Sequence, residues 1–251
     1  MRLPLLSPAF PGTVGSEWGK LWSVRSAGLC LLAALVVTGV FSYYYGAIAR
    51  INGHPVQPVG NAAASSVVLV QFAFAVLAMV AVTSEYTTGS IRATLLWTPR
   101  RHRVQAAKAL VAAGVAFSGG TVCAVLGTAV AWGAFDGRAS FDAGTTARQV
   151  LAVGVYQALV AVLTVGVAFA ARHPAGALAV LVSLLWAVPS TLLGLGAATV
   201  VDGLPYGAGG HFVSAGAGGA PYGPVTAVLI VAAWAAAAHL AGRYALHRAD
   251  A

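Results

Sequence analysis

Long apolar runs separated by short polar segments dominate the sequence. Six of these runs reach or approach the roughly 20 residues with which an α-helix crosses a hydrocarbon core of about 30 Å. They are residues 27–49, 62–82, 109–134, 150–171, 176–200 and 225–241. The pattern predicts an all-α integral membrane protein whose six transmembrane helices form a single transmembrane domain over residues 1–251.

The fifth run, residues 176–200, contains its own helix breakers. Pro189 has no amide hydrogen to donate, and its ring clashes with the preceding helical turn. Gly194 and Gly196 follow shortly after it. We therefore expect this span to kink or break near its outer end.

Ahead of the first run, residues 14–26 have the spacing of a short amphipathic helix. Four apolar side chains recur at i, i+4, i+7 and i+8 and share one stripe: Val14, Trp18, Leu21 and Trp22. Ser16 is placed as an N-cap, and Glu17 falls in the first turn, where the helix dipole favours an acid. We expect an interfacial helix with both Trp rings at the depth of the lipid headgroups; the alternative is a frayed start to the first span.

Composition supports a membrane protein and weakens other classes. Hydrophobic residues make up 59% of the chain and charged residues 8%, against roughly a quarter charged in soluble domains, and mean hydropathy is +0.83. The net charge of +8 is spread between apolar runs instead of lying on one soluble domain, so we expect no nucleic-acid partner. Cys30 and Cys123 fall inside apolar runs and indicate neither a disulfide framework nor a metal site.

The basic residues predict the orientation. With six spans, only three of the 14 Lys and Arg residues fall on one side of the membrane, namely Arg50, Arg138 and Arg148. The side richer in Lys and Arg faces the cytoplasm. We therefore expect a multi-pass plasma-membrane protein with both termini and the polar segment 85–108 in the cytoplasm.

Residues 85–108 form the largest island of charge in the chain. Ser90 is placed to cap a short helix carrying Ile91 and Leu95 and, less centrally, Leu96, and Thr98–Pro99 should end it. The apolar stripe of this helix needs a cover, either from the protein's own cytoplasmic helix ends or from a partner. Basic residues follow directly and are expected to anchor the topology: Arg100, Arg101, Arg103 and Lys108.

The runs contain little that could perform chemistry. No Asp, Glu, Lys or Arg lies within them, which disfavours ion-coupled transport. Gln71, Tyr156 and Gln157 are candidate pathway residues, although such groups more often join packed helices by hydrogen bonds. Residues 15–21 resemble a phosphate-binding loop but have one residue too few between the glycines and a Leu where Ser or Thr should bind magnesium. We therefore expect no catalytic residues, no metal site and no directly bound cofactor.

Two alternatives to a transporter remain open. An intramembrane serine protease would use Ser118 in the third run and His239 in the sixth, but a Ser beside glycines and one His are weak indications without their spatial pairing. A passive membrane protein could bind a hydrophobic compound without turnover, for instance in immunity or assembly.

The polar segment resembles the permease subunits of type-2 ABC exporters. The matching residues are Glu85-Tyr86, Gly89-Ser90-Ile91-Arg92, Thr94-Leu95, Pro99-Arg100-Arg101 and Lys108. The motif spans about a tenth of the chain, and the interfacial helix and six spans extend the likeness in layout. The resemblance implies a coupling helix at residues 85–97 and a broken or re-entrant segment after the fifth span, from which the Gly-rich residues 201–224 depart.

The resemblance also implies partners and an activity. The segment would bind an ATP-binding subunit through one set of residues: Glu85, Tyr86, Gly89, Ser90, Ile91, Arg92 and Leu95. Glu85 would act as a charged hinge paired with a Lys or Arg. Two ATP-binding subunits holding ATP and Mg would drive a pair of permeases, a second copy or a homologue, to export a hydrophobic or amphipathic metabolite, peptide or lipid.

Overall fold

The computed structural model describes residues 10–97, 100–214 and 221–248. Within these residues, six helical segments are long and apolar enough to cross a membrane: α2 (Arg25–Ile51), α3 (Gly60–Thr87), α5 (Arg101–Phe135), α6 (Ala143–Ala171), the segment Pro174–Gly194, and α11 (Pro224–Arg248, apolar to Leu246). All six coincide with the apolar runs of the sequence. The expected helical fold with six apolar spans is therefore confirmed.

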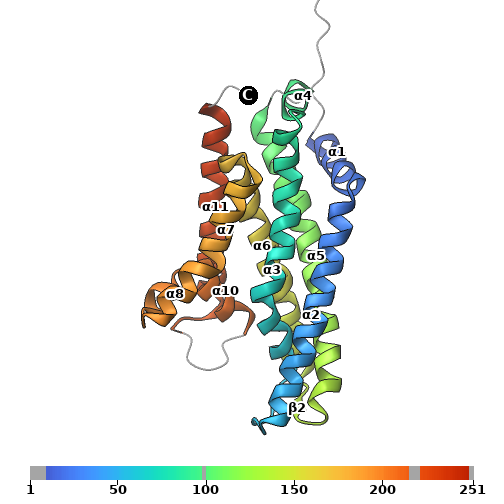
Figure 1. Ribbon diagram of the computed structural model, residues 1–251, viewed down its shortest axis with the longest axis vertical. Coiled ribbons are helices and arrows are strands. Elements are labelled where there is room, and N and C mark those ends of the chain that lie inside the picture. Colours follow the sequence, from blue (N-terminus) through green and yellow to red (C-terminus); the bar gives the residue numbers. More distant parts are fainter. Residues whose placement is uncertain (1–9, 98–99, 215–220, 249–251) are drawn as a thin grey trace, which may run out of the picture.

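The long helices stand side by side along the long axis of the molecule (Figure 1). Helix α6 lies at the centre of the packing, since it contacts α3, α5 and α11. Large buried side chains such as Leu163 and Phe169 project from it into the core. Helix α2 packs on α3 and α5 and leaves one face apolar and exposed, as a lipid-facing helix does.

Helices α6 and α11 touch through glycines. A methyl group added at Gly166 would collide with the backbone of Ala238, and one added at Gly242 would lie 2.5 Å from the Gly166 carbonyl oxygen. Small residues allow this approach, which supplies packing energy between helices in lipid. Gly114 and Ser118 have the same small-residue spacing on α5 but make no such contact, because a methyl group added at Gly114 would meet no atom of a neighbouring helix within 4 Å among the described residues.

Short strands join two loops at the end of the bundle opposite α4 (Figure 1). Strand β1 (Gln57–Pro58) follows α2, and β2 (Ala139–Ser140) follows α5; the two pair in parallel. The Val59 amide extends the pairing by donating to the Ser140 carbonyl at 3.0 Å. The pairing fastens the ends of α2 and α5 to one another.

The N-terminal helix α1 (Phe10–Ser23) begins earlier than expected. Ser16 is therefore not an N-cap; its hydroxyl donates to the Thr13 carbonyl at 2.8 Å within the helix. The expected start was wrong because Pro11, which needs no amide partner, fits the first helical turn. Glu17 lies in mid-helix instead of the first turn and is buried.

The predicted apolar stripe of α1 divides into two parts. Leu21 is buried against Ala27 and Val111, and Val14 packs at the edge of the same cluster. Trp18 and Trp22 are 49% and 46% exposed, with their rings edge to face at 5.7 Å. Two exposed indoles on one short helix are typical of a membrane interface.

The fifth span is irregular next to Pro189, as expected. Helix α7 (Pro174–Val182) continues into a π-helical turn, Ser183–Ala187, and then into α8 (Val188–Gly194). A π turn accommodates the missing proline amide without ending the helix. The chain leaves the helix at Gly194, and Gly196 has a φ of +77°, which favours glycine.

Two short helices follow the fifth span. They are α9 (Ala198–Asp202) and α10 (Pro205–Val213), and α10 packs back against α6 and α11. Of the Gly-rich segment 201–224, residues 215–220 lie outside the described residues.

Candidate functional site

A short helix, α4 (Ile91–Trp97), lies at the end of the bundle between α3 and α5 (Figure 1). It is shorter than the expected 85–97, because α3 continues through Glu85 to Thr87. Gly89 makes the turn with a φ of +71°, a conformation that residues with a Cβ rarely adopt. The positive φ therefore explains why a glycine stands at position 89 of the polar segment.

Ser90 stands directly before α4, as a capping residue would. Its hydroxyl lies 2.9 Å from the Thr88 hydroxyl, and its carbonyl accepts the Thr94 amide at 3.1 Å. The expected stop at Thr98–Pro99 lies outside the described residues; α4 ends at Trp97. The turn from Thr88 to Ser90 thus sets the direction in which α4 leaves the bundle.

The apolar stripe of α4 is covered by the protein itself. Ile91 is 5% exposed within the main core cluster, and Leu95 packs against the same cluster. The opposite face carries Arg92, which is exposed, and Leu96 and Trp97, which are 78% and 75% exposed. Of the residues on α4 that were expected to contact a partner, Arg92 alone faces outward. Trp97 was not predicted from the sequence as a partner contact, although it lies on the outward face.

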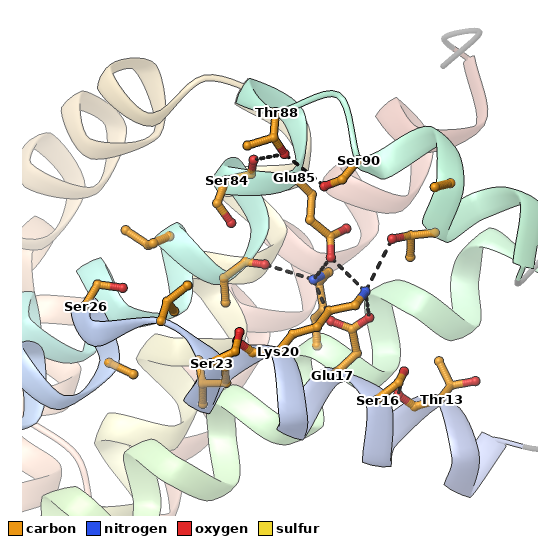
Figure 2. A pocket seen from close by; sticks show the side chains of 18 of the residues that line it. Thr13, Ser16, Glu17, Lys20, Ser23, Ser26, Ser84, Glu85, Thr88 and Ser90 are labelled. Atoms are coloured by element: carbon orange, nitrogen blue, oxygen red, sulfur yellow. Dashed lines mark hydrogen bonds and ion pairs between the residues drawn. The ribbon is translucent and has the colours of Figure 1, made fainter.

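A cluster of four charges lies beneath α4 and brings together α1, α3 and α5 (Figure 2). Lys108 lies 2.6 Å from Glu17 Oε2 and 2.9 Å from Glu85 Oε1. Lys20 lies 2.7 Å from Glu17 Oε1 and 2.9 Å from the same Glu85 oxygen. The expected pairing of Glu85 with a basic residue is therefore confirmed, with two lysines.

Lys108 occupies a different environment from that expected for a basic anchor. Its side chain is 2% exposed, and its third hydrogen bond goes to the Ala81 carbonyl at 2.9 Å. A buried ammonium is stable only when such acceptors replace its water. Glu17 and Lys108 are separated by 91 positions, so no local pattern in the sequence could have predicted their contact.

Lys20 connects the cluster to α4. Its ammonium also donates to the Thr94 hydroxyl at 3.3 Å. Burial lowers the pKa of Lys20, but the hydrogen bonds and charges of Glu17 and Glu85 outweigh this effect and raise the pKa above its ordinary value of 10.5. Lys20 is therefore a cation at neutral pH.

Tyr86 lies inside the bundle beside the cluster. Its ring meets Phe169 of α6 edge to face at 6.2 Å, and the Arg172 guanidinium lies 6.0 Å from the ring centroid. Arg172 donates to the Ala245 carbonyl of α11 at 2.5 Å, and Arg101 donates to the Leu246 carbonyl at 2.9 Å. Residues of the motif region therefore hold the end of α11 in place.

Two of the candidate pathway residues meet. The Tyr156 hydroxyl donates to Gln71 Oε1 at 2.7 Å, and the Gln71 amide donates to the Leu185 carbonyl at 3.4 Å next to the π turn. The pair borders a cavity of about 260 Å³ that α9 and α10 cover. Gln157 lies elsewhere, fully buried against Gly120.

The protease pair is not assembled. Ser118 donates to the Gly114 carbonyl at 2.9 Å. The contact of α5 with His239 is made by Gln105, whose amide donates to the His239 carbonyl at 2.8 Å. Ser118 lies thirteen residues, about 20 Å, further along α5. The two residues therefore do not form a nucleophile and base.

Comparison with known proteins does not place the chain in a family. No protein-family model matches it, and no curated protein matches it. Within the described ranges, no group of three or more His, Cys, Asp and Glu residues could hold a metal ion. The geometry of the chain itself is therefore the basis for a functional proposal.

Proposed function

We propose that the chain is the membrane-spanning subunit of an ATP-driven exporter of the type-2 ABC class. One observation carries the proposal: α4 leaves the bundle at a turn through Gly89 and presents Arg92, Leu96 and Trp97 to the outside. An exposed tryptophan beside an arginine is typical of the central contacts of a protein interface. α4 lies at the same end of the bundle as α1 and the end of α11 (Figure 1), and we assign this end to the cytoplasm.

The ion cluster supplies a physical route for coupling. A force applied to α4 reaches Lys20 through Thr94, and the buried lysine and glutamate contacts pass it to α1, α3 and α5. Breaking a buried ion pair costs about 3–5 kcal/mol, so these elements move together instead of sliding past one another. Glu85, which accepts from both lysines, is the centre of this connection.

The proposed assembly contains two permease chains and two ATP-binding subunits, which hold ATP and Mg. The permease has no catalytic role in this assembly. The cargo is hydrophobic or amphipathic, in keeping with the apolar spans, and its outer exit includes the covered cavity at Gln71 and Tyr156.

The outward face of α4 provides the test. The chain is co-expressed with ABC ATP-binding subunits from the same genome, purified, and assayed for the bound subunit and for ATPase activity. Arg92→Glu combined with Leu96→Asp should reduce the co-purified subunit at least tenfold, because both side chains are exposed and the fold does not depend on them. Arg243→Glu, an exposed arginine near the same end on α11, should leave association unchanged.

Undiminished association and unchanged ATPase stimulation in the double variant would refute the proposal. The passive-binder alternative has its own test, made in cells with a subunit that cannot hydrolyse ATP. Under our proposal, export of the compound stops in these cells. A passive binder would still protect the cell from the compound.

A further inference from the structure

A cavity of about 670 Å³ opens beside the ion cluster, between α1 and the end of α3 (Figure 2). Its volume lies within the 300–1,000 Å³ typical of small-molecule sites. α4 closes one side through Thr94 and Trp97. Trp97 belongs both to the cavity wall and to the outward face of α4, whereas Arg92 and Leu96, the residues altered in the association test, do not border the cavity.

The lining changes from apolar to polar along α3. Leu77, Val80 and Ala81 form the apolar part, and Ser84, Glu85 and Thr88 form the polar part nearer α4. These residues span twelve positions, eleven steps apart, or about 16 Å of helix. α1 and the start of α2 contribute Glu17 and Lys20 at the polar end and Leu21, Val24 and Ala27 further along, together with the hydroxyl groups of Ser23 and Ser26. Such a gradient fits a molecule with a polar head and an apolar body.

The polar part contains more free acceptors than donors. Each lysine ammonium has three N–H groups, and each already has three acceptors: Glu17, Glu85 and Thr94 for Lys20, and Glu17, Glu85 and the Ala81 carbonyl for Lys108. No cationic donor in the cluster is left for an anionic head. A phosphate or sulfate would therefore have to break existing ion pairs.

Three of the lining hydroxyl groups follow the same pattern, whereas the buried Thr13 hydroxyl has no hydrogen-bond partner among the described residues. Ser16 donates to the Thr13 carbonyl at 2.8 Å, Ser23 to the Lys20 carbonyl at 2.7 Å, and Thr88 to the Ser84 carbonyl at 2.8 Å. Their hydrogens are used within the helices, while their oxygen lone pairs remain available. The polar part of the lining is thus suited to a head that donates hydrogen bonds.

Glu85 provides the point of attachment. The residue is 7% exposed and lines the cavity, and among the described residues its Oε2 has no hydrogen-bond partner. A buried carboxylate oxygen without a donor costs free energy that an incoming N–H group would recover. Trp97, at the rim, offers an aromatic ring that attracts cations.

We propose that this cavity binds an amphipathic primary amine, with its protonated ammonium at the Glu85 carboxylate and its apolar body along Leu77 and Val80. Two sources supply this chemistry: a free alkylamine-like compound, or the ammonium headgroup of phosphatidylethanolamine. The site does not depend on the proposed export function, because it is formed by this chain alone.

Binding is measured by equilibrium dialysis of radiolabelled decylamine against the protein in phosphatidylcholine nanodiscs, with empty nanodiscs subtracted. We expect saturable binding of one amine per chain. Unlabelled decylamine should compete, whereas decyl sulfate and decyl glucoside, which have the same tail, should compete at least tenfold more weakly. Equal competition by either of these, or no saturable binding, would overturn the proposal.

Variants locate the site. Val80→Phe fills the apolar part without touching the ion cluster and should weaken binding at least tenfold, while Val122→Phe on the exposed face of α5 should not. Glu85→Gln should also weaken binding at least tenfold, with folding checked by size-exclusion chromatography. Wild-type binding by Val80→Phe contradicts the proposal even if Glu85→Gln fails to fold.

A second set of nanodiscs distinguishes the source. If phosphatidylethanolamine in the bilayer suppresses decylamine binding, the lipid headgroup is the occupant; if binding is unchanged, the occupant is a free amine. Either result supports an ammonium site at Glu85.

Discussion

Lys108 illustrates how a single buried charge organises its surroundings. It lies in α5 directly before the apolar run 109–134, and two carboxylates from α1 and α3 and one backbone carbonyl surround it. The local balance of charge depends on all four members of the cluster, because Lys20 shares both carboxylates. Removing one member leaves a buried charge with too few partners.

Lys108→Met should destabilise the protein by about 3–5 kcal/mol, since Glu17 and Glu85 then share only the half-exposed Lys20. Equilibrium unfolding by SDS titration in mixed micelles measures the loss. Adding Glu17→Gln should restore a large part of it, because the remaining Lys20 and Glu85 balance each other. If Lys108→Met unfolds at the same SDS fraction as the wild type, the cluster contributes nothing to stability.

At the scale of elements, the turn between α3 and α4 depends on one backbone conformation. A methyl group at Gly89 meets no atom within 4 Å among the described residues, so only the φ of +71° opposes a larger residue. Gly89→Ala should therefore cost about 1 kcal/mol. Gly89→Asn should cost less, because Asn tolerates this region better.

Gly114 offers a matched control for Gly89→Ala. It also has open space around it but lies within α5, so Gly114→Ala should be neutral or stabilising by up to about 1 kcal/mol. The same SDS titration compares the two variants. Equal effects at both positions would show that the turn imposes no conformational requirement.

The elements were largely predictable from the sequence, because an apolar run of spanning length and a Ser before a short apolar stripe are local signals. The start of α1 was misplaced, since Ser16 has the chemistry of a cap although Pro11 already opens the helix. The ion cluster was only partly predictable. A partner for Glu85 was expected, but Glu17 and Lys108 meet through packing of α1 on α5, which no periodicity reveals.

At the scale of the whole molecule, the contact between α6 and α11 joins the last span to the rest. Gly166→Val should push the helices apart, because even a methyl group there meets the backbone of Ala238 and His239. Overpacking of this kind costs about 1–3 kcal/mol. The SDS titration should show the loss relative to the wild type, and unfolding of Gly166→Val at the same SDS fraction as the wild type would contradict the prediction.

The pairing of β1 with β2 affects how force is transmitted along the helices. It fastens α2 and α5 at one end, and the charges of Glu17, Glu85 and Lys108 fasten α1, α3 and α5 at the other. Because α5 is fastened at both ends, we expect it to carry a push along its length with little bending. We expect strain delivered along α5 to be taken up at the π turn of Ser183–Ala187, where the helical hydrogen bonding is irregular.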